Sequence, residues 1–172
     1  MNARVKWLDR KFNFDYPAGM FPYFLERLRD TPIVLSGISA PLEETVLTRR
    51  LKNTWSIKEH IGHLTDLEEI HITRLEQLIE GVSMLLPANM TNKKTYLANH
   101  NETDIAGLLG NLKKTRGNLI SRFEKLSDAD IIRKATHPRL QQEMRVVDLA
   151  YFVAEHDNHH ITIIREILSD KE

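Results

Sequence analysis

One segment, residues 146–168, constrains the fold more than any other. Its apolar residues recur at the three- and four-residue spacing of a helix that buries one face. His156 and His160 fall in the middle of that face, and because they are four residues apart their imidazoles point the same way. A buried imidazole needs partners for its ring nitrogens, and a metal ion is one such partner. The predicted buried stripe consists of Leu149, Phe152, Val153, His156, His160, Ile163, Ile164 and Ile167.

The composition is typical of a soluble globular protein. The 172 residues are enough for one hydrophobic core, so we expect a single domain over residues 1–172. The formal net charge of zero argues against a general nucleic-acid binder. No apolar run is long enough to cross a membrane, residues 1–14 lack the pattern of a signal peptide, and cysteine is absent. These features predict a cytoplasmic protein without disulfides, thiolate metal ligands or a cysteine nucleophile.

Three further segments have helical periodicity. In the first, residues 18–38, Pro32 is expected to bend or break the helix because proline removes a backbone hydrogen bond. The second, residues 57–80, begins at a capping box in which Ser56 caps the amide of Glu59 while Glu59 reaches back. Both segments should bury one apolar face.

The third segment covers residues 104–126, with Asn101 or Thr103 as its cap. Residues 81–101 before it show little periodicity, and a loop of this length is expected to line a site or an oligomer contact. No segment has a clear strand pattern, and residues 1–16 suggest an irregular arm. The sequence therefore predicts an all-α, antiparallel four-helix bundle with an irregular N-terminal arm. Bundles of this kind build cofactor sites from side chains on facing helices.

A third ligand for a metal ion could come from the 57–80 helix. It offers His60, His63 and His71, and the periodicity alone does not choose among them. Joined to His156 and His160, any one of them would complete a three-histidine site. Catalytic zinc sites have three protein ligands and one open position. Nitrogen ligands also suit nickel, iron and copper.

Two motifs resemble those of the DinB-like superfamily of four-helix metalloproteins: WSIKEHIGHLTDLE at residues 55–68 and AEHDNHH at 154–160. The resemblance covers nearly the whole chain. It implies that the metal ligands are His63, His156 and His160, and that the metal is zinc or nickel. The superfamily includes S-transferases that use bacillithiol, mycothiol or glutathione, proposed metal-dependent hydrolases, and members without a known activity. A homodimer is also plausible from the family.

Further residues are candidates for supporting roles. Ligating histidines usually donate their second N–H to a carboxylate or carbonyl, which makes Asp66 and Glu59 candidates, although a solvated helix face explains both equally well. His159 is a candidate for the same outer layer. The roles of four other histidines stay open. His60 and His71 could relay a proton, whereas His100 and His137 lie in predicted loops where solvent exposure is expected.

Three functional hypotheses follow. The first is an enzyme in which a metal-bound water or thiol is the reactive group, acting on a small-molecule substrate. The resemblance slightly favours thiol transfer to an electrophile over hydrolysis, and Asn92, Lys93 and Arg139 could bind an anionic substrate group. The second is a non-catalytic metal-binding or stress-related module. The third is a bundle that holds no metal.

Overall fold

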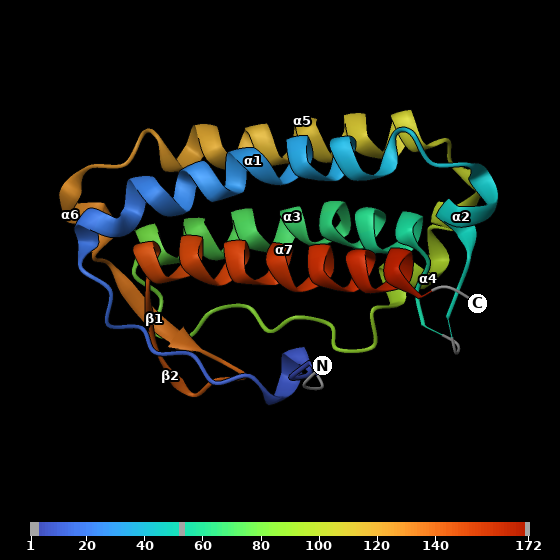
Figure 1. Ribbon diagram of the computed structural model, residues 1–172. Helices are drawn as coiled ribbons and strands as arrows, with labels where there is room; N and C mark the ends of the chain where they lie inside the picture. Colours follow the sequence, from blue (N-terminus) through green and yellow to red (C-terminus); the bar gives the residue numbers. More distant parts are fainter. Residues whose placement is uncertain (1–3, 52–53, 171–172) are drawn as a thin grey trace.

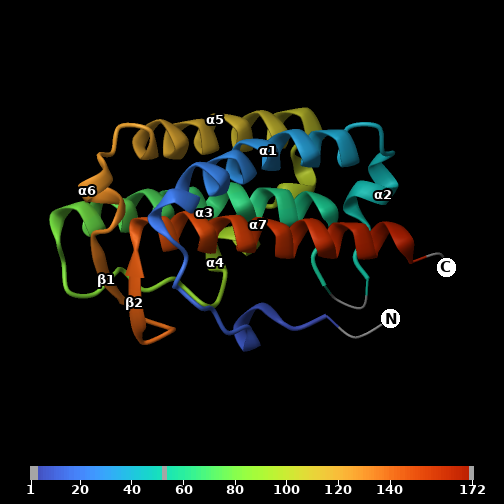
Figure 2. The same ribbon diagram turned by 60° about the vertical axis from the view of Figure 1, so that its left-hand side comes forward.

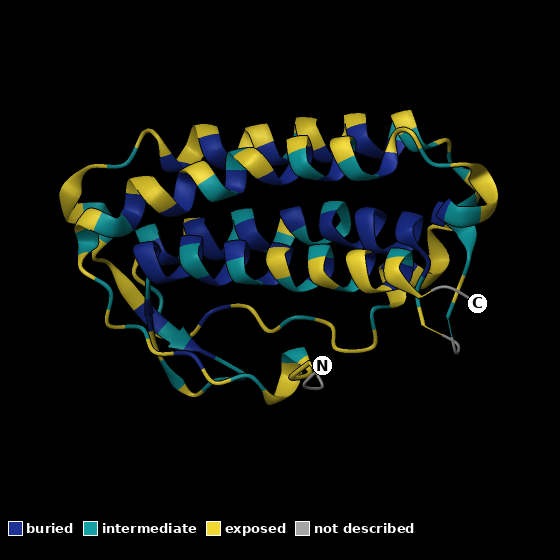
Figure 3. Ribbon diagram, viewed as in Figure 1, coloured by how far each residue is buried: buried dark blue, intermediate teal, exposed yellow. Residues whose placement is uncertain are grey.

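The computed structural model describes residues 4–51 and 54–170, and four long helices dominate it. Figure 1 shows two layers, with α1 (Phe21–Ser39) and α5 (Ile105–Phe123) in one and α3 (Ile57–Glu80) and α7 (Val146–Ser169) in the other. The inner faces of these helices are buried and their outer turns are exposed (Figure 3). The predicted all-α four-helix bundle is confirmed. Among the described residues, every helix is too short or too polar to span a bilayer.

Short elements connect and cover the bundle. In both ribbon views, a β-hairpin, the N-terminal arm and the loop after α3 lie on the α3–α7 side, away from α1 and α5 (Figures 1 and 2). This covering layer borders the candidate site described below. The short elements are η1 (Trp7–Asp9), η2 (Ala18–Met20), α2 (Glu44–Thr48), α4 (Lys93–Leu97), η3 (His100–Glu102), α6 (Asp128–Ile131), β1 (Lys134–His137) and β2 (Gln142–Arg145).

The order of the helices around the bundle differs from a simple up-and-down arrangement. Helix α1 packs against α5 and α7, and α3 packs against the same two helices. The consecutive long helices α1 and α3 therefore lie on a diagonal. Adjacent helices run antiparallel in the α1–α5 and α3–α7 pairs, whereas α1 runs parallel to α7 and α3 to α5 (Figure 1). Long connections make this crossover possible, because short loops would place consecutive helices side by side.

The helix boundaries follow local capping chemistry. Helix α3 begins at the predicted box, where Ser56 accepts from the Glu59 amide, and it ends at Gly81, whose φ of 78° is left-handed. The predicted cap of α5 is wrong. Asp104 caps that helix by accepting from the Gly107 amide, whereas Asn101 hydrogen-bonds the Ser56 hydroxyl. A carboxylate directly before the first turn competes better for the amide donors than residues farther upstream.

Pro32 does not break α1, which continues through it from Phe21 to Ser39. Proline lacks the N–H that would bond the carbonyl four residues earlier, at Leu28. The Arg116 guanidinium of α5 supplies that missing donor, with Nη1 at 3.2 Å from the Leu28 oxygen. A tertiary contact thus replaces the lost helical hydrogen bond.

Two predictions for the connecting segments were wrong. The segment around His137 was expected to be a loop, but β1 and β2 form an antiparallel hairpin that pairs Lys134 with Arg145 and His137 with Gln142. Strands of four residues are too short to give a clear alternating pattern. Likewise, the segment after α3 contains α4 and η3, two helical turns too short for periodicity to predict.

Candidate metal centre

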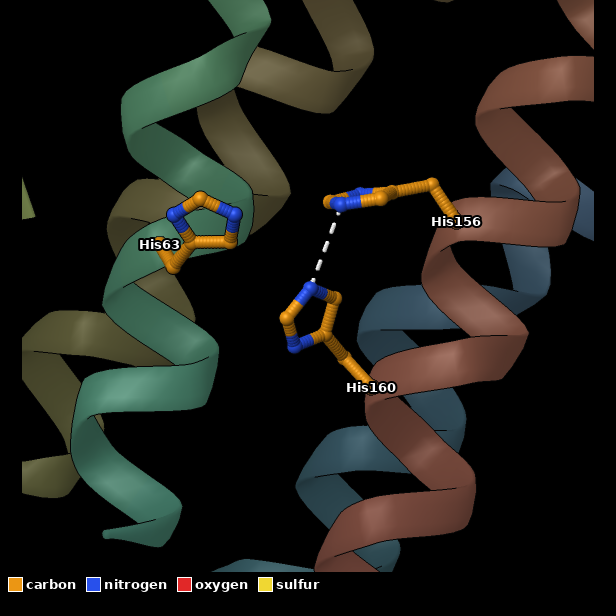
Figure 4. A group of neighbouring side chains, drawn as sticks. All are labelled: His63, His156 and His160. Carbon is orange, nitrogen blue, oxygen red and sulfur yellow. Dashed lines mark hydrogen bonds between the residues drawn. The ribbon is translucent and has the colours of Figure 1, made fainter. Parts of the chain in front are cut away.

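Three histidines converge between α3 and α7 (Figure 4). His63 comes from α3, and His156 and His160 lie one turn apart on α7. One ring nitrogen from each lies within 4.8 Å of the others, and each residue is at most 6% exposed. Their assignment as metal ligands stays a prediction, but this cluster can bind a metal ion.

Burial keeps the three imidazoles neutral. It lowers the pKa of His63 to about 4 and the pKa values of His156 and His160 well below the ordinary value. The positive charge that His63 would carry when protonated lowers the pKa values of His156 and His160 further. Neutral imidazole is the form that donates a lone pair to a metal, so the site is in its ligating state at neutral pH.

Hydrogen bonds orient two of the rings from behind. His63 Nδ1 lies 2.9 Å from the Thr95 hydroxyl, and His160 Nδ1 lies 2.8 Å from His60 Nδ1. The Nε2 atoms of His156 and His160 approach to 3.2 Å (Figure 4). His156 Nδ1 is buried and has no hydrogen-bond partner among the described residues. A metal ion fits this arrangement because a hydrogen bond from behind orients a ligating imidazole, and an ion would take the place of the contact between the two Nε2 atoms.

All three histidines line one pocket of about 400 Å³, which we call the histidine pocket. Its wall includes Trp55, whose ring centroid lies 4.6 Å from that of His63, and Trp7 from the N-terminal arm. The loop after α3 adds Ala88, Asn89, Met90 and Asn92. This result agrees with the expectation that this loop lines a site.

None of the three residues predicted to support the ligands hydrogen-bonds a ring of the cluster, although His159 lines the histidine pocket and its ring lies 5.4 Å from that of His160. Asp66 hydrogen-bonds His100 Nε2 at 2.9 Å, and Glu59 accepts from the Ser56 amide and pairs with Arg50. His159 is half-buried and packs its ring on Trp7. Thr95 and His60 occupy the places that these residues were expected to fill. No sequence signal pointed to Thr95, since α4 itself was not predicted.

His100 and His137 are buried, at 8% and 2% exposure, which corrects the expectation of exposed loop residues. The His100 ring occupies the space beside Gly62, where an added Cβ would lie 2.2 Å from the ring. His137 is buried because β1 turns it toward the bundle, where its ring packs on Phe152. His71 is buried as well, and its Nδ1 has no partner among the described residues.

A bundle with a buried three-imidazole cluster between two facing helices belongs to the class of candidate metal-binding helical bundles. The chain is a member of the DinB superfamily, whose sequence profile matches residues 25–164. A search of curated proteins finds no match.

Solved structures share the fold. YfiT from Bacillus subtilis, a probable metal-dependent hydrolase with an unusual four-helix bundle topology, superposes with a TM-score of 0.77 at 19% identity, covering 92% of this chain and 91% of its own. The colibactin self-resistance protein ClbS, solved with double-stranded DNA, gives 0.68 at 13% identity over 88% and 97%. The mycothiol-dependent maleylpyruvate isomerase gives 0.66 at 10% identity over 88% of this chain and 62% of its own.

Proposed function

We propose that this protein is a metal-dependent enzyme that transfers a low-molecular-weight thiol to an electrophilic small molecule. His63, His156 and His160 would hold a divalent ion, zinc or nickel by preference, with iron or copper also compatible with nitrogen ligands. The observation that carries this proposal is the cluster itself. It is buried and neutral, opens on a pocket, and has no fourth histidine or carboxylate among the described residues that joins it.

The divalent ion would lower the pKa of a bound thiol or water, so that the nucleophile forms at neutral pH. The chain contributes no cysteine, so the thiol would come from a cofactor such as bacillithiol, mycothiol or glutathione. His60 and Thr95 would hold the His160 and His63 rings in their ligating orientations. Trp55 and Trp7 would limit the access of water to the reacting groups.

A second pocket favours a reaction between two molecules. It has a volume of about 280 Å³ and shares Trp7, Leu67, Ala88, Met90 and His156 with the histidine pocket. One pocket could receive the thiol cofactor and the other the electrophile, meeting beside His156. Hydrolysis is the second candidate, supported by the shared fold of YfiT, which is a probable metal-dependent hydrolase.

Metal content tests the first part of the proposal. Protein purified without a nickel column should contain about one divalent ion per chain by elemental analysis, and His63→Ala and His156→Ala should lose most of it. His159→Ala is the matched control, because it removes a histidine of the same helix that lines the same pocket but is not one of the three converging imidazoles. Metal-free wild-type protein, or equal metal content in all variants, would overturn the proposal.

Activity separates the two reactions. Metal-loaded protein should accelerate the reaction of bacillithiol, mycothiol or glutathione with 1-chloro-2,4-dinitrobenzene, and His156→Ala should not. Hydrolysis of p-nitrophenyl esters without any thiol would favour the second candidate. A protein that binds metal stoichiometrically but catalyses neither reaction would support the non-catalytic module.

A further inference from the structure

We propose that the second pocket binds the carboxylate of a small organic acid and directs its apolar body toward His156. We call this site the arginine pocket, after Arg74 and Arg139 in its lining. One part of the inference rests on the proposed function, namely that the bound acid is the electrophilic substrate. Binding of the carboxylate itself requires no metal.

The charge of the arginine pocket is unbalanced. Arg74 of α3 and Arg139 of the hairpin turn both line it, and no aspartate or glutamate does. Neither arginine forms an ion pair with a described residue, and Arg139 donates from Nη1 to the Leu8 carbonyl at 3.4 Å. Arg74 is only 3% exposed, and its side-chain hydrogen bond runs from Nε to the Leu86 carbonyl at 2.9 Å. Among the described residues, no carboxylate pairs with its terminal nitrogens.

Arg116 shows how this fold neutralises a buried arginine that has a structural role. It is 1% exposed and pairs with Glu68 at 2.6 Å and also with Asp157. A buried cation without such a partner is costly, and an arginine fork matches the geometry of a carboxylate. The pocket around Arg74 thus lacks a counterion that a ligand can provide.

Buried polar atoms of neighbouring side chains point to the same conclusion. His71 Nδ1, His137 Nε2 and Arg139 Nη2 are buried without a hydrogen-bond partner among the described residues. Such atoms are rare in folded proteins and usually mark a missing water, ion or ligand. The pKa of Arg74 also indicates that its charge has no neutralising partner, because burial and the positive charge of Arg139 lower it to about 10.

The rest of the lining selects an apolar acid over a free inorganic anion. Leu67, Ile70, Pro87, Met90 and Phe152 form the wall, and the volume of about 280 Å³ suits a carboxylate attached to one ring or a short chain. His156 lines both pockets, so a ligand anchored by the arginines would extend toward the histidine cluster.

Calorimetric titration with 4-phenylbutyrate tests this proposal in protein treated with EDTA and again after zinc loading. We expect 4-phenylbutyrate to bind in both forms, at least tenfold more tightly than 4-phenylbutanol or inorganic phosphate. Arg74→Met and Arg139→Met should each weaken binding at least tenfold. Arg122→Met, an exposed arginine of α5, should leave it unchanged.

The outcomes are separable from those of the metal experiments. Binding that persists in EDTA-treated protein supports the arginine pocket even if the protein proves to hold no metal. Equal affinity for the alcohol and the acid would overturn the proposal, as would tighter binding of phosphate or unchanged binding in both arginine variants. Circular dichroism checks that each variant folds, and Arg139→Lys provides a conservative change outside the long helices.

Discussion

The buried charge network around Arg116 gives the sharpest test of how this bundle is held together. Arg116 of α5 lies between Glu68 of α3 and Asp157 of α7, and it also donates to the Leu28 carbonyl of α1. One side chain thus joins all four long helices. We expect Arg116→Met, which keeps much of the side-chain volume, to destabilise the protein severely.

The magnitude follows from what the change leaves behind. Glu68 is 2% exposed and Asp157 is 1% exposed, so both carboxylates would lose their buried cation. Breaking a buried ion pair costs about 3–5 kcal/mol. The Leu28 carbonyl, already without a helical donor because of Pro32, would lose the one replacement donor that the described residues supply, at about 1–3 kcal/mol. Protonation of a carboxylate would offset part of this loss, because burial already raises the pKa of Glu68. We therefore expect a loss of about 4–6 kcal/mol in the free energy of unfolding.

Urea unfolding of metal-free protein at pH 7, followed by circular dichroism, measures this loss. With a slope of about 2 kcal/mol per molar urea, the midpoint should fall by about 2–3 M. The control is Arg122→Met. Arg122 and its partner Glu76 are both about half exposed, so this change should alter stability by less than about 1 kcal/mol. Adding Glu68→Gln and Asp157→Asn to Arg116→Met should restore part of the stability. A loss for Arg116→Met no larger than that of the control would refute the reasoning.

Three further predictions concern the histidines. His60→Ala should weaken metal binding about 10–100-fold, because the His160 ring loses its orienting partner, and competition with a chelating dye measures this; an unchanged affinity would exclude the orienting role. Metal-free protein should lose stability as the pH falls below about 6.5. Burial lowers the pKa values of His60 and His137 in the folded protein to about 3, so between pH 6.5 and that value only the unfolded chain takes up protons at these histidines. The free energy of unfolding should therefore fall by about 1.4 kcal/mol per histidine and pH unit. Equal urea midpoints at pH 7.5 and 5.5 would contradict this. Gly62→Ala should destabilise the fold by about 1–3 kcal/mol, because the new Cβ would collide with the His100 ring, whereas Gly110→Ala in α5, which has open space, should not; thermal unfolding compares the two.

The sequence by itself determined the features that depend on neighbours along the chain. The bounds of α3 follow from the Ser56–Glu59 capping box and from Gly81, which lie within one turn of the helix ends. The pairing of His156 with His160 follows from their four-residue spacing on one helix. The all-α class was predictable for the same reason, since the helical pattern is a spacing of three and four residues along the chain.

Only the tertiary structure decided which residues from distant segments meet. Periodicity left His60, His63 and His71 as equal candidates, and only the family resemblance favoured His63; the physical reason lies in the register between α3 and α7. It brings His63 into the cluster, places His60 behind His160, and turns His71 toward the arginine pocket. Local spacing cannot predict this register, because it depends on the crossover that sets α1 and α3 on a diagonal. Arg74 and Arg139 line one pocket because the hairpin packs against α7 and pairs Thr136 with Met84 of the segment after α3, which are contacts between residues far apart in the sequence.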